Sequence, residues 1–209
     1  MLAGNENTAQ VSSGHLGCTT ESKSYDIRKG DRTYTFWDTC GLNEGEEGNV
    51  PPMKAMESLV KQVRVIGISL IIYCVRGRFT NIVGQNYKWF CWKVCKGKVP
   101  VLLVVTGLEG EDKDEWWTEN KVYIEHLELS FAGHACVTTS KGMNNRYEDE
   151  YLVSAAKVWK LVEENRNRTP WTISPKWYKI FFRPKRSGPG SRYVSSFIRN
   201  SQIHFKFSK

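Results

Sequence analysis

Apolar and polar positions along the chain first predict strands. Residues 22–27 and 33–38 alternate between apolar and polar positions on either side of a polar, glycine-containing turn, which is typical of a β-hairpin. The runs 68–75 and 99–105 are almost continuously apolar and rich in β-branched residues, as expected of strands covered on both faces. A shorter apolar run predicts another strand over residues 132–138.

Between these strands the apolar positions recur at the 3.6-residue spacing of a helix. The clearest case is 147–164, where Tyr151, Val158 and Val162 share one side and charged residues occupy the other. The same spacing, or a helix-like composition, predicts helices over residues 53–65, 81–96, 116–129 and 147–164. Residues 43–52, rich in Gly, Glu and Pro, predict a loop.

Strand and helix thus alternate three times after the hairpin, which predicts an α/β domain with three layers and a mostly parallel sheet between helices. Ligands of such sheets bind at the carboxyl ends of the strands. The residues that follow Phe36, Val75, Val105 and Val137 are therefore the first candidates for a functional site.

Composition supports a folded domain, since 40% of the 209 residues are hydrophobic and 12% are aromatic. The longest apolar run, 68–75, is far shorter than the roughly 20 residues of a transmembrane helix, and the N-terminus lacks the pattern of a secretion signal. We therefore expect a cytoplasmic protein with six reduced cysteines. Cys91 and Cys95 favour helix packing over a metal site, because no second ligand pair follows at a zinc-like spacing.

The net charge of +8 is concentrated near the C-terminus. Residues 166–209 hold 11 Lys or Arg and no Asp or Glu, which leaves 19 basic and 22 acidic residues, a net charge of −3, in residues 1–165. This change divides the chain into a domain, 1–165, and a basic, aromatic-rich extension, 166–209. The extension favours an anionic partner, either a nucleic acid or an acidic protein or membrane surface.

Four polar segments stand at or before the predicted strand ends: Thr19-Thr20, Asp38-Thr39-Cys40-Gly41, Thr106-Gly107-Leu108-Glu109 and Thr139-Ser140-Lys141. In this order they resemble the switch and base-recognition motifs of P-loop GTPases, and most closely those of the septin-like and immune-associated GTP-binding proteins and their fungal relatives. The resemblance spans roughly residues 2–164 and implies a G domain that binds guanine nucleotide with Mg²⁺.

The resemblance also implies roles for these residues. Thr19, or alternatively Thr20, would reach Mg²⁺ and the γ-phosphate, Asp38 would hold the metal through water, and the Gly41 amide would face the γ-phosphate. A carboxylate suits a hard cation that keeps several waters, and glycine lets the backbone approach an anion.

The remaining two segments would recognise the base. Thr106 and Glu109 would contact it, with Gly107 where the family has lysine, and Ser140 and Lys141 would close the pocket. Because glutamate is longer than the family's aspartate, guanine and adenine both remain open.

The phosphate loop of this family, Gly-x-x-x-x-Gly-Lys-Ser/Thr, does not occur in the 209 residues, where the only Gly-Lys pair is Gly97-Lys98. Residues 2–19 resemble the end of the helix after that loop and the switch loop that follows. We therefore expect that the chain begins beyond the loop, either because the reading frame starts late or because the gene is truncated. Nucleotide binding should then be weak or absent.

The first strand of the family belongs between 33–38 and 68–75, and without it these two strands would have unpaired edges unless they closed on each other.

Three hypotheses about function follow. The chain is a GTP-binding domain, a pseudo-GTPase that acts as an interaction module, or a nucleic-acid binder that uses its basic extension. GTP hydrolysis should be slow at best, because Leu42 stands where small GTPases place a water-orienting glutamine. A homodimer or another G-domain partner is compatible with the first two hypotheses.

Overall fold

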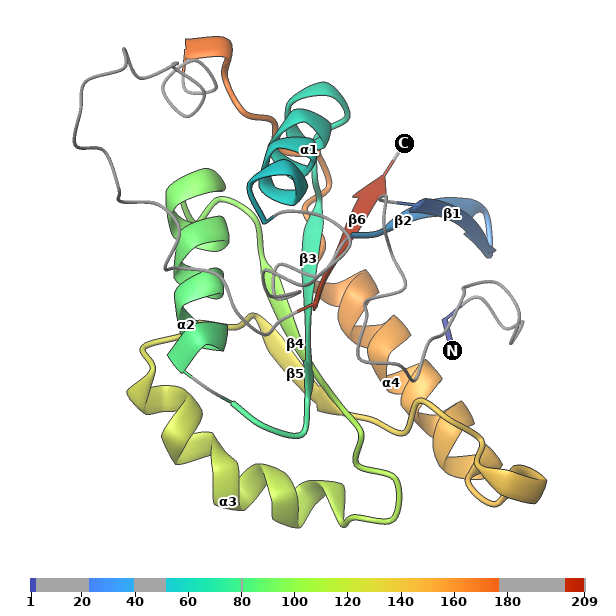
Figure 1. Ribbon diagram of the computed structural model, residues 1–209. Helices are drawn as coiled ribbons and strands as arrows, with labels where there is room; N and C mark the ends of the chain where they lie inside the picture. Colours follow the sequence, from blue (N-terminus) through green and yellow to red (C-terminus); the bar gives the residue numbers. More distant parts are fainter. Residues whose placement is uncertain (3–22, 40–51, 80, 177–201, 209) are drawn as a thin grey trace.

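A six-stranded sheet lies between helices in the computed structural model, which describes residues 1–2, 23–39, 52–79, 81–176 and 202–208 (Figure 1). The elements, in chain order, are β1 (Lys23–Lys29), β2 (Arg32–Asp38), α1 (Pro52–Val65), β3 (Leu70–Arg76), α2 (Asn81–Tyr87), the π-helix η1 (Lys88–Val94), β4 (Val101–Thr106), α3 (Lys113–His126), β5 (Gly133–Cys136), the 3₁₀ turn η2 (Met143–Asn145), α4 (Glu148–Asn165) and β6 (Gln202–Ser208). Every helix and strand that the periodicity predicts is present, so the α/β prediction is confirmed.

The sheet is mixed, and the prediction of a mostly parallel sheet is wrong in this respect. Its strand order is β1-β2-β6-β3-β4-β5. Only β3–β4 and β4–β5 pair in parallel, whereas β1–β2, β2–β6 and β6–β3 pair antiparallel. The parallel part is therefore a three-strand unit, β3-β4-β5, and the hairpin β1-β2 joins it through β6.

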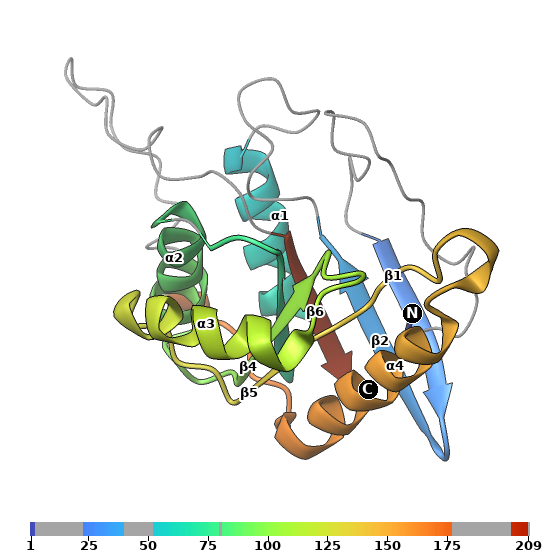
Figure 2. The same ribbon diagram turned by 90° about the horizontal axis from the view of Figure 1, so that it is seen from below.

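The C-terminal strand β6 lies between β2 and β3 (Figure 2). Phe205 pairs with Trp37 on one side and with Ile71 on the other. The sequence predicts that β2 and β3 either pair with each other or keep unpaired edges. Neither occurs, because β6 pairs with both strands. The position that the GTPase resemblance assigns to an N-terminal parallel strand is taken by a C-terminal antiparallel one.

The two faces of the sheet are covered unequally (Figure 1). Alternate side chains of β3 and β4, such as Tyr73 and Leu103, pack in one core with residues from α1, α2, η1 and α3. The opposite set, such as Ile72 and Val104, packs with α4 in a second core. In that second core Tyr34 and Phe36 of β2 meet the Trp159 ring edge to face, at centroid distances of 5.2 and 5.5 Å. None of the helices in the described part of the chain is long and apolar enough to cross a membrane.

Parts of the predicted extension are integral to this fold. Beyond α4, Trp171 forms a β-bridge with Ile68, and the Ile173 side chain is buried in the core beneath α1. Further on, residues 202–208 supply an inner strand of the sheet. The boundary at residue 165 marks a change of charge, whereas the fold uses chain on both sides of it.

The position of β6 is open to a direct chemical test. Gln202 is the register partner of Cys74 on β3, and directly opposed positions of antiparallel strands lie close enough for a disulfide. We predict that Gln202→Cys forms a disulfide with Cys74 within one chain under mild oxidation. Peptide mapping by mass spectrometry on the monomer fraction will detect the linked peptides.

The matched control is Ile203→Cys, whose register partner is Tyr73 and not Cys74. It should not link to Cys74. If neither variant links, or if both link equally, β6 does not occupy this register.

Candidate functional site

The carboxyl ends of β3, β4 and β5 form one edge of the sheet, because these strands are parallel. Strand β2 runs in the same direction, since it and β3 both pair antiparallel with β6. Asp38 at the end of β2 is level with Ile72 across β6, because both are register partners of His204. It therefore stands four positions short of Arg76, roughly 13 Å along the strand direction.

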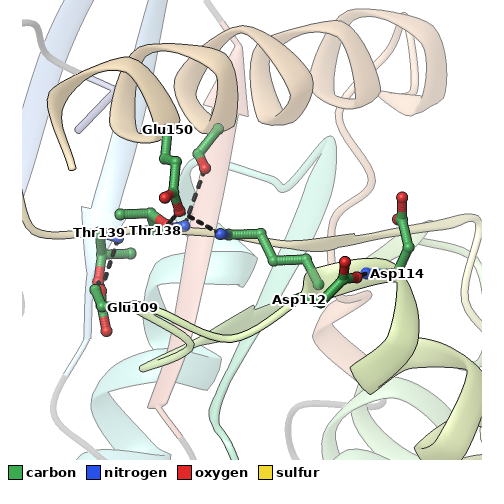
Figure 3. Close-up of polar contacts among 8 residues, drawn as sticks. Glu109, Asp112, Asp114, Thr138, Thr139 and Glu150 are labelled. Atoms are coloured by element: carbon green, nitrogen blue, oxygen red, sulfur yellow. Dashed lines mark hydrogen bonds and ion pairs between the residues drawn. The ribbon is translucent and has the colours of Figure 1, made fainter.

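Glu109 connects the loops after β4 and β5. Its carboxylate oxygen Oε1 accepts hydrogen bonds from the backbone N–H and the hydroxyl of Thr139, at 3.0 and 3.1 Å (Figure 3). Burial raises the pKa of Glu109, but hydrogen bonds from Thr139 and from the backbone of Glu109 and Ser140 outweigh burial and lower the pKa overall. The arrangement thus holds an anionic hydrogen-bond acceptor at the edge between two parallel strands.

A second set of polar contacts fixes the start of the β5 loop to α3 and α4 (Figure 3). The backbone N–H of Thr138 donates to Ser154 Oγ at 2.9 Å, and the Thr138 hydroxyl donates to Glu150 Oε2 at 2.9 Å. Lys113 Nζ lies 2.6 Å from the same carboxylate oxygen. Hydrogen bonds from Lys113 and Thr138 lower the pKa of Glu150. The loop therefore leaves the sheet in a fixed direction.

Ser140 and Lys141, the two base-recognition candidates after β5, form polar contacts with their own loop and with α4. Ser140 Oγ accepts a hydrogen bond from the Gly142 N–H at 3.1 Å. Lys141 Nζ forms an ion pair with Glu148 at 3.0 Å, at the first residue of α4. Thr106 is the half-buried last residue of β4. The structure therefore brings Glu109 and the β5 loop together, while Lys141 is held toward α4.

The predicted magnesium ligands are described only in part. Thr19, Thr20 and Gly41 lie outside the described residues. Asp38 is half-buried and has an interaction partner. Within the residues that the structure describes, no group of three or more His, Cys, Asp or Glu could hold a metal ion. Asp38 fits only an ion that takes most of its ligands from water and phosphate, as Mg²⁺ does.

The cysteines of the described part are thiols without disulfides. Cys91 on η1 and Cys95 directly after it are both buried in the core, and burial raises the pKa of each thiol well above its usual value. They pack as small apolar residues, as the helical spacing suggested. Cys74 is half-buried and Cys91, Cys95 and Cys136 are buried, and none of the four forms a disulfide.

Sequence reasoning pointed to the end of β3 but named no residue there. Arg76-Gly77-Arg78 occupies this position and lines a pocket with a volume of about 470 Å³. Gly107, Leu108, Glu111 and Trp116 complete the lining. The signal was present in the sequence, since two arginines directly follow an apolar strand. It was missed because Arg-Gly-Arg belongs to none of the motifs that carry the GTPase resemblance.

Comparison with protein-family models, with curated proteins and with solved structures gives no significant match for this chain. The fold and the site therefore define the class. This is an α/β protein with a mixed sheet, in which polar and charged residues suited to ligand contacts gather at the carboxyl ends of three parallel strands.

The lowered pKa of Glu150 predicts a specific pH dependence of stability. Because the folded-state pKa lies below the ordinary value of 4.5, the unfolded chain binds more protons near that pH, and stability falls as the pH drops below 4.5. Glu150→Gln should reduce this fall by less than about 1 kcal/mol, since solvent screens an exposed pair. Urea unfolding between pH 3 and 7 measures it.

Glu163→Gln, at an exposed site near the other end of α4, is the control and should leave the pH profile unchanged. Identical profiles for wild type and Glu150→Gln would show that Lys113 and Thr138 do not favour the ionised carboxylate.

Proposed function

We propose that the protein binds a purine nucleotide at the carboxyl edge of β3, β4 and β5, as a GTP-binding domain of the septin-like and immune-associated type does. The observation that supports this most directly is the Glu109 carboxylate, held between the β4 and β5 loops by two hydrogen bonds from Thr139. In the resembling family, an acidic residue after the corresponding strand takes two hydrogen bonds from guanine.

The carboxylate accepts hydrogen bonds from Thr139 and from the backbone of Glu109 and Ser140, so a base would share this acceptor with them. A carboxylate offers about four lone-pair sites on its two oxygens, and both bonds from Thr139 end on Oε1. The Oε2 atom takes part in neither bond. Guanine presents two adjacent N–H donors on one edge, which match a fixed carboxylate, whereas adenine presents an acceptor at the equivalent ring nitrogen. An ionised Glu109 therefore favours guanine.

The phosphates of such a nucleotide would extend toward the ends of β3 and β2. Mg²⁺, when bound, would neutralise part of the phosphate charge. The resemblance gives the role of metal ligand to Asp38 through water and to Thr19 directly, and the phosphates would then have to span the roughly 13 Å between the levels of Arg76 and Asp38. Weak binding is part of the proposal, because these residues alone supply few charged contacts to phosphate.

Glu109→Gln tests the proposal, because it replaces the acceptor by a group that offers both a donor and an acceptor. We predict that GDP binding weakens by about tenfold or more while ADP binding changes little, since a hydrogen bond to a charged group contributes about 1.5–3 kcal/mol. Ligand-observed NMR with GDP and ADP in the presence of Mg²⁺ suits weak binding. The GDP-to-ADP affinity ratio does not depend on the fraction of folded protein.

Glu119→Gln, at an exposed position on α3, is the matched control and should keep the wild-type ratio. Equal affinity of the wild type for GDP and ADP would contradict guanine recognition by Glu109, and so would an unchanged ratio in Glu109→Gln.

A further inference from the structure

The pocket at the ends of β3 and β4 is suited in size and position to a small ligand. Its volume of about 470 Å³ falls within the roughly 300–1,000 Å³ of small-molecule sites. Arg76 and Thr106 are register partners at the last positions of two parallel strands, so the pocket opens at the edge where α/β sheets bind ligands. It lies next to the edge that carries the Glu109–Thr139 contact, because β4 pairs with both β3 and β5.

Two guanidinium groups face this pocket from a tight turn. The Arg78 N–H donates to the Arg76 carbonyl oxygen at 2.6 Å, and Gly77 between them has φ of +56°, a conformation that glycine adopts readily. Both side chains are exposed, and neither has a carboxylate partner among the described residues. Two guanidinium groups on one short turn repel each other, and a bound anion would relieve this repulsion.

Gly107 allows the Arg76 side chain to lie across the β4 loop. A Cβ atom at residue 107 would come within 2.8 Å of Arg76 Cγ, closer than packed atoms approach, and within 3.1 Å of Arg76 Nε, which is a tight contact. Gly107 also has φ of +75°, which disfavours other residues. The glycine that stands in place of the family's lysine therefore has a structural role, since it makes room for the arginine of the neighbouring strand.

We propose that Arg76 and Arg78 contact the phosphate groups of the nucleotide whose base Glu109 recognises, so that the nucleotide lies along the edge from β5 toward β3. This inference rests on the proposed function. Arginine suits the role because its planar group donates two parallel hydrogen bonds to phosphate oxygens.

The remaining wall of the pocket fits this role. Trp116 is partly buried in the first turns of α3, whose start is capped by Asp112 through hydrogen bonds from the Asp114 and Glu115 N–H groups. The ring supplies an apolar wall on one side of the pocket. Glu111 is the one carboxylate of the lining, so the pocket keeps a net positive charge.

The experiment compares GDP with guanosine, which differ only in the phosphates, on the full chain. In the wild type, GDP should bind more tightly than guanosine. The double variant Arg76→Gln/Arg78→Gln should lose this advantage, a fall of about tenfold or more in GDP affinity, with guanosine affinity unchanged. Arg76→Lys/Arg78→Lys keeps the charge without the planar fork and should retain part of the advantage. Lys121→Gln, at an exposed site on α3, is the control for charge alone.

The outcomes separate this inference from the proposed function. If the double variant keeps the wild-type advantage of GDP over guanosine, the arginines do not bind phosphate, and the Glu109 result decides the proposed function independently. If the advantage is lost but GDP and ADP bind equally, the pocket binds phosphate and the proposed guanine recognition fails. Arginine-dependent binding of inorganic pyrophosphate without binding of any nucleotide would overturn the inference. Because both arginines are exposed, thermal melts of all variants should match the wild type.

Discussion

The rest of the structure depends on hydrogen-bonding partners for the backbone of β3. This strand is buried from Leu70 to Tyr73, and buried N–H and C=O groups without partners are costly. Strand β4 satisfies one edge of β3 in parallel, and β6 satisfies the other in the antiparallel direction. Strands β2 and β3 run in the same direction, and there is room for one strand between them. Either a parallel or an antiparallel strand in this place can form backbone hydrogen bonds with both. The fold fills this position with residues that are far away in sequence.

The candidate site follows from the same arrangement. Because β3, β4 and β5 are parallel, their carboxyl ends lie at one edge of the sheet. This alone brings together Arg76, Thr106 and the loop after Cys136. This edge differs from an ordinary surface because its polar side chains are held in place by hydrogen bonds between the loops and to α4. Glu109 is bonded across to Thr139, and Thr138 is bonded to Ser154 and Glu150 on α4. These contacts fix two loops relative to each other before any ligand arrives, which reduces the entropy lost on binding.

Periodicity in the sequence was sufficient for the local structure, because each predicted helix and strand buries one face or both. It was insufficient for the sheet. The segment 202–208 alternates Ile203, Phe205 and Phe207 with polar residues, the pattern of a strand, but it lies in the stretch 166–209, whose many Lys and Arg residues predict a basic extension. Pairing partners depend on contacts between distant segments, which a pattern along the chain does not record. The same limit applies to the site. Glu109 could be identified from its motif, whereas the approach of Arg76 to Gly107 depends on the register of two strands.

The origin of β6 gives the C-terminal segment a role that its charge alone would not suggest. Strand β3 carries Arg76 at its carboxyl end and pairs with β6 over Leu70 to Cys74, immediately before the turn that presents both arginines. How firmly β3 is held in the sheet therefore depends on its pairing with residues 202–208. The position of Arg76 against Gly107 depends on the same pairing. Loss of this pairing would expose the backbone of two apolar strands and loosen the strand end that carries the proposed phosphate contacts. On this basis the C-terminal strand supports both the stability of the sheet and the geometry of the site.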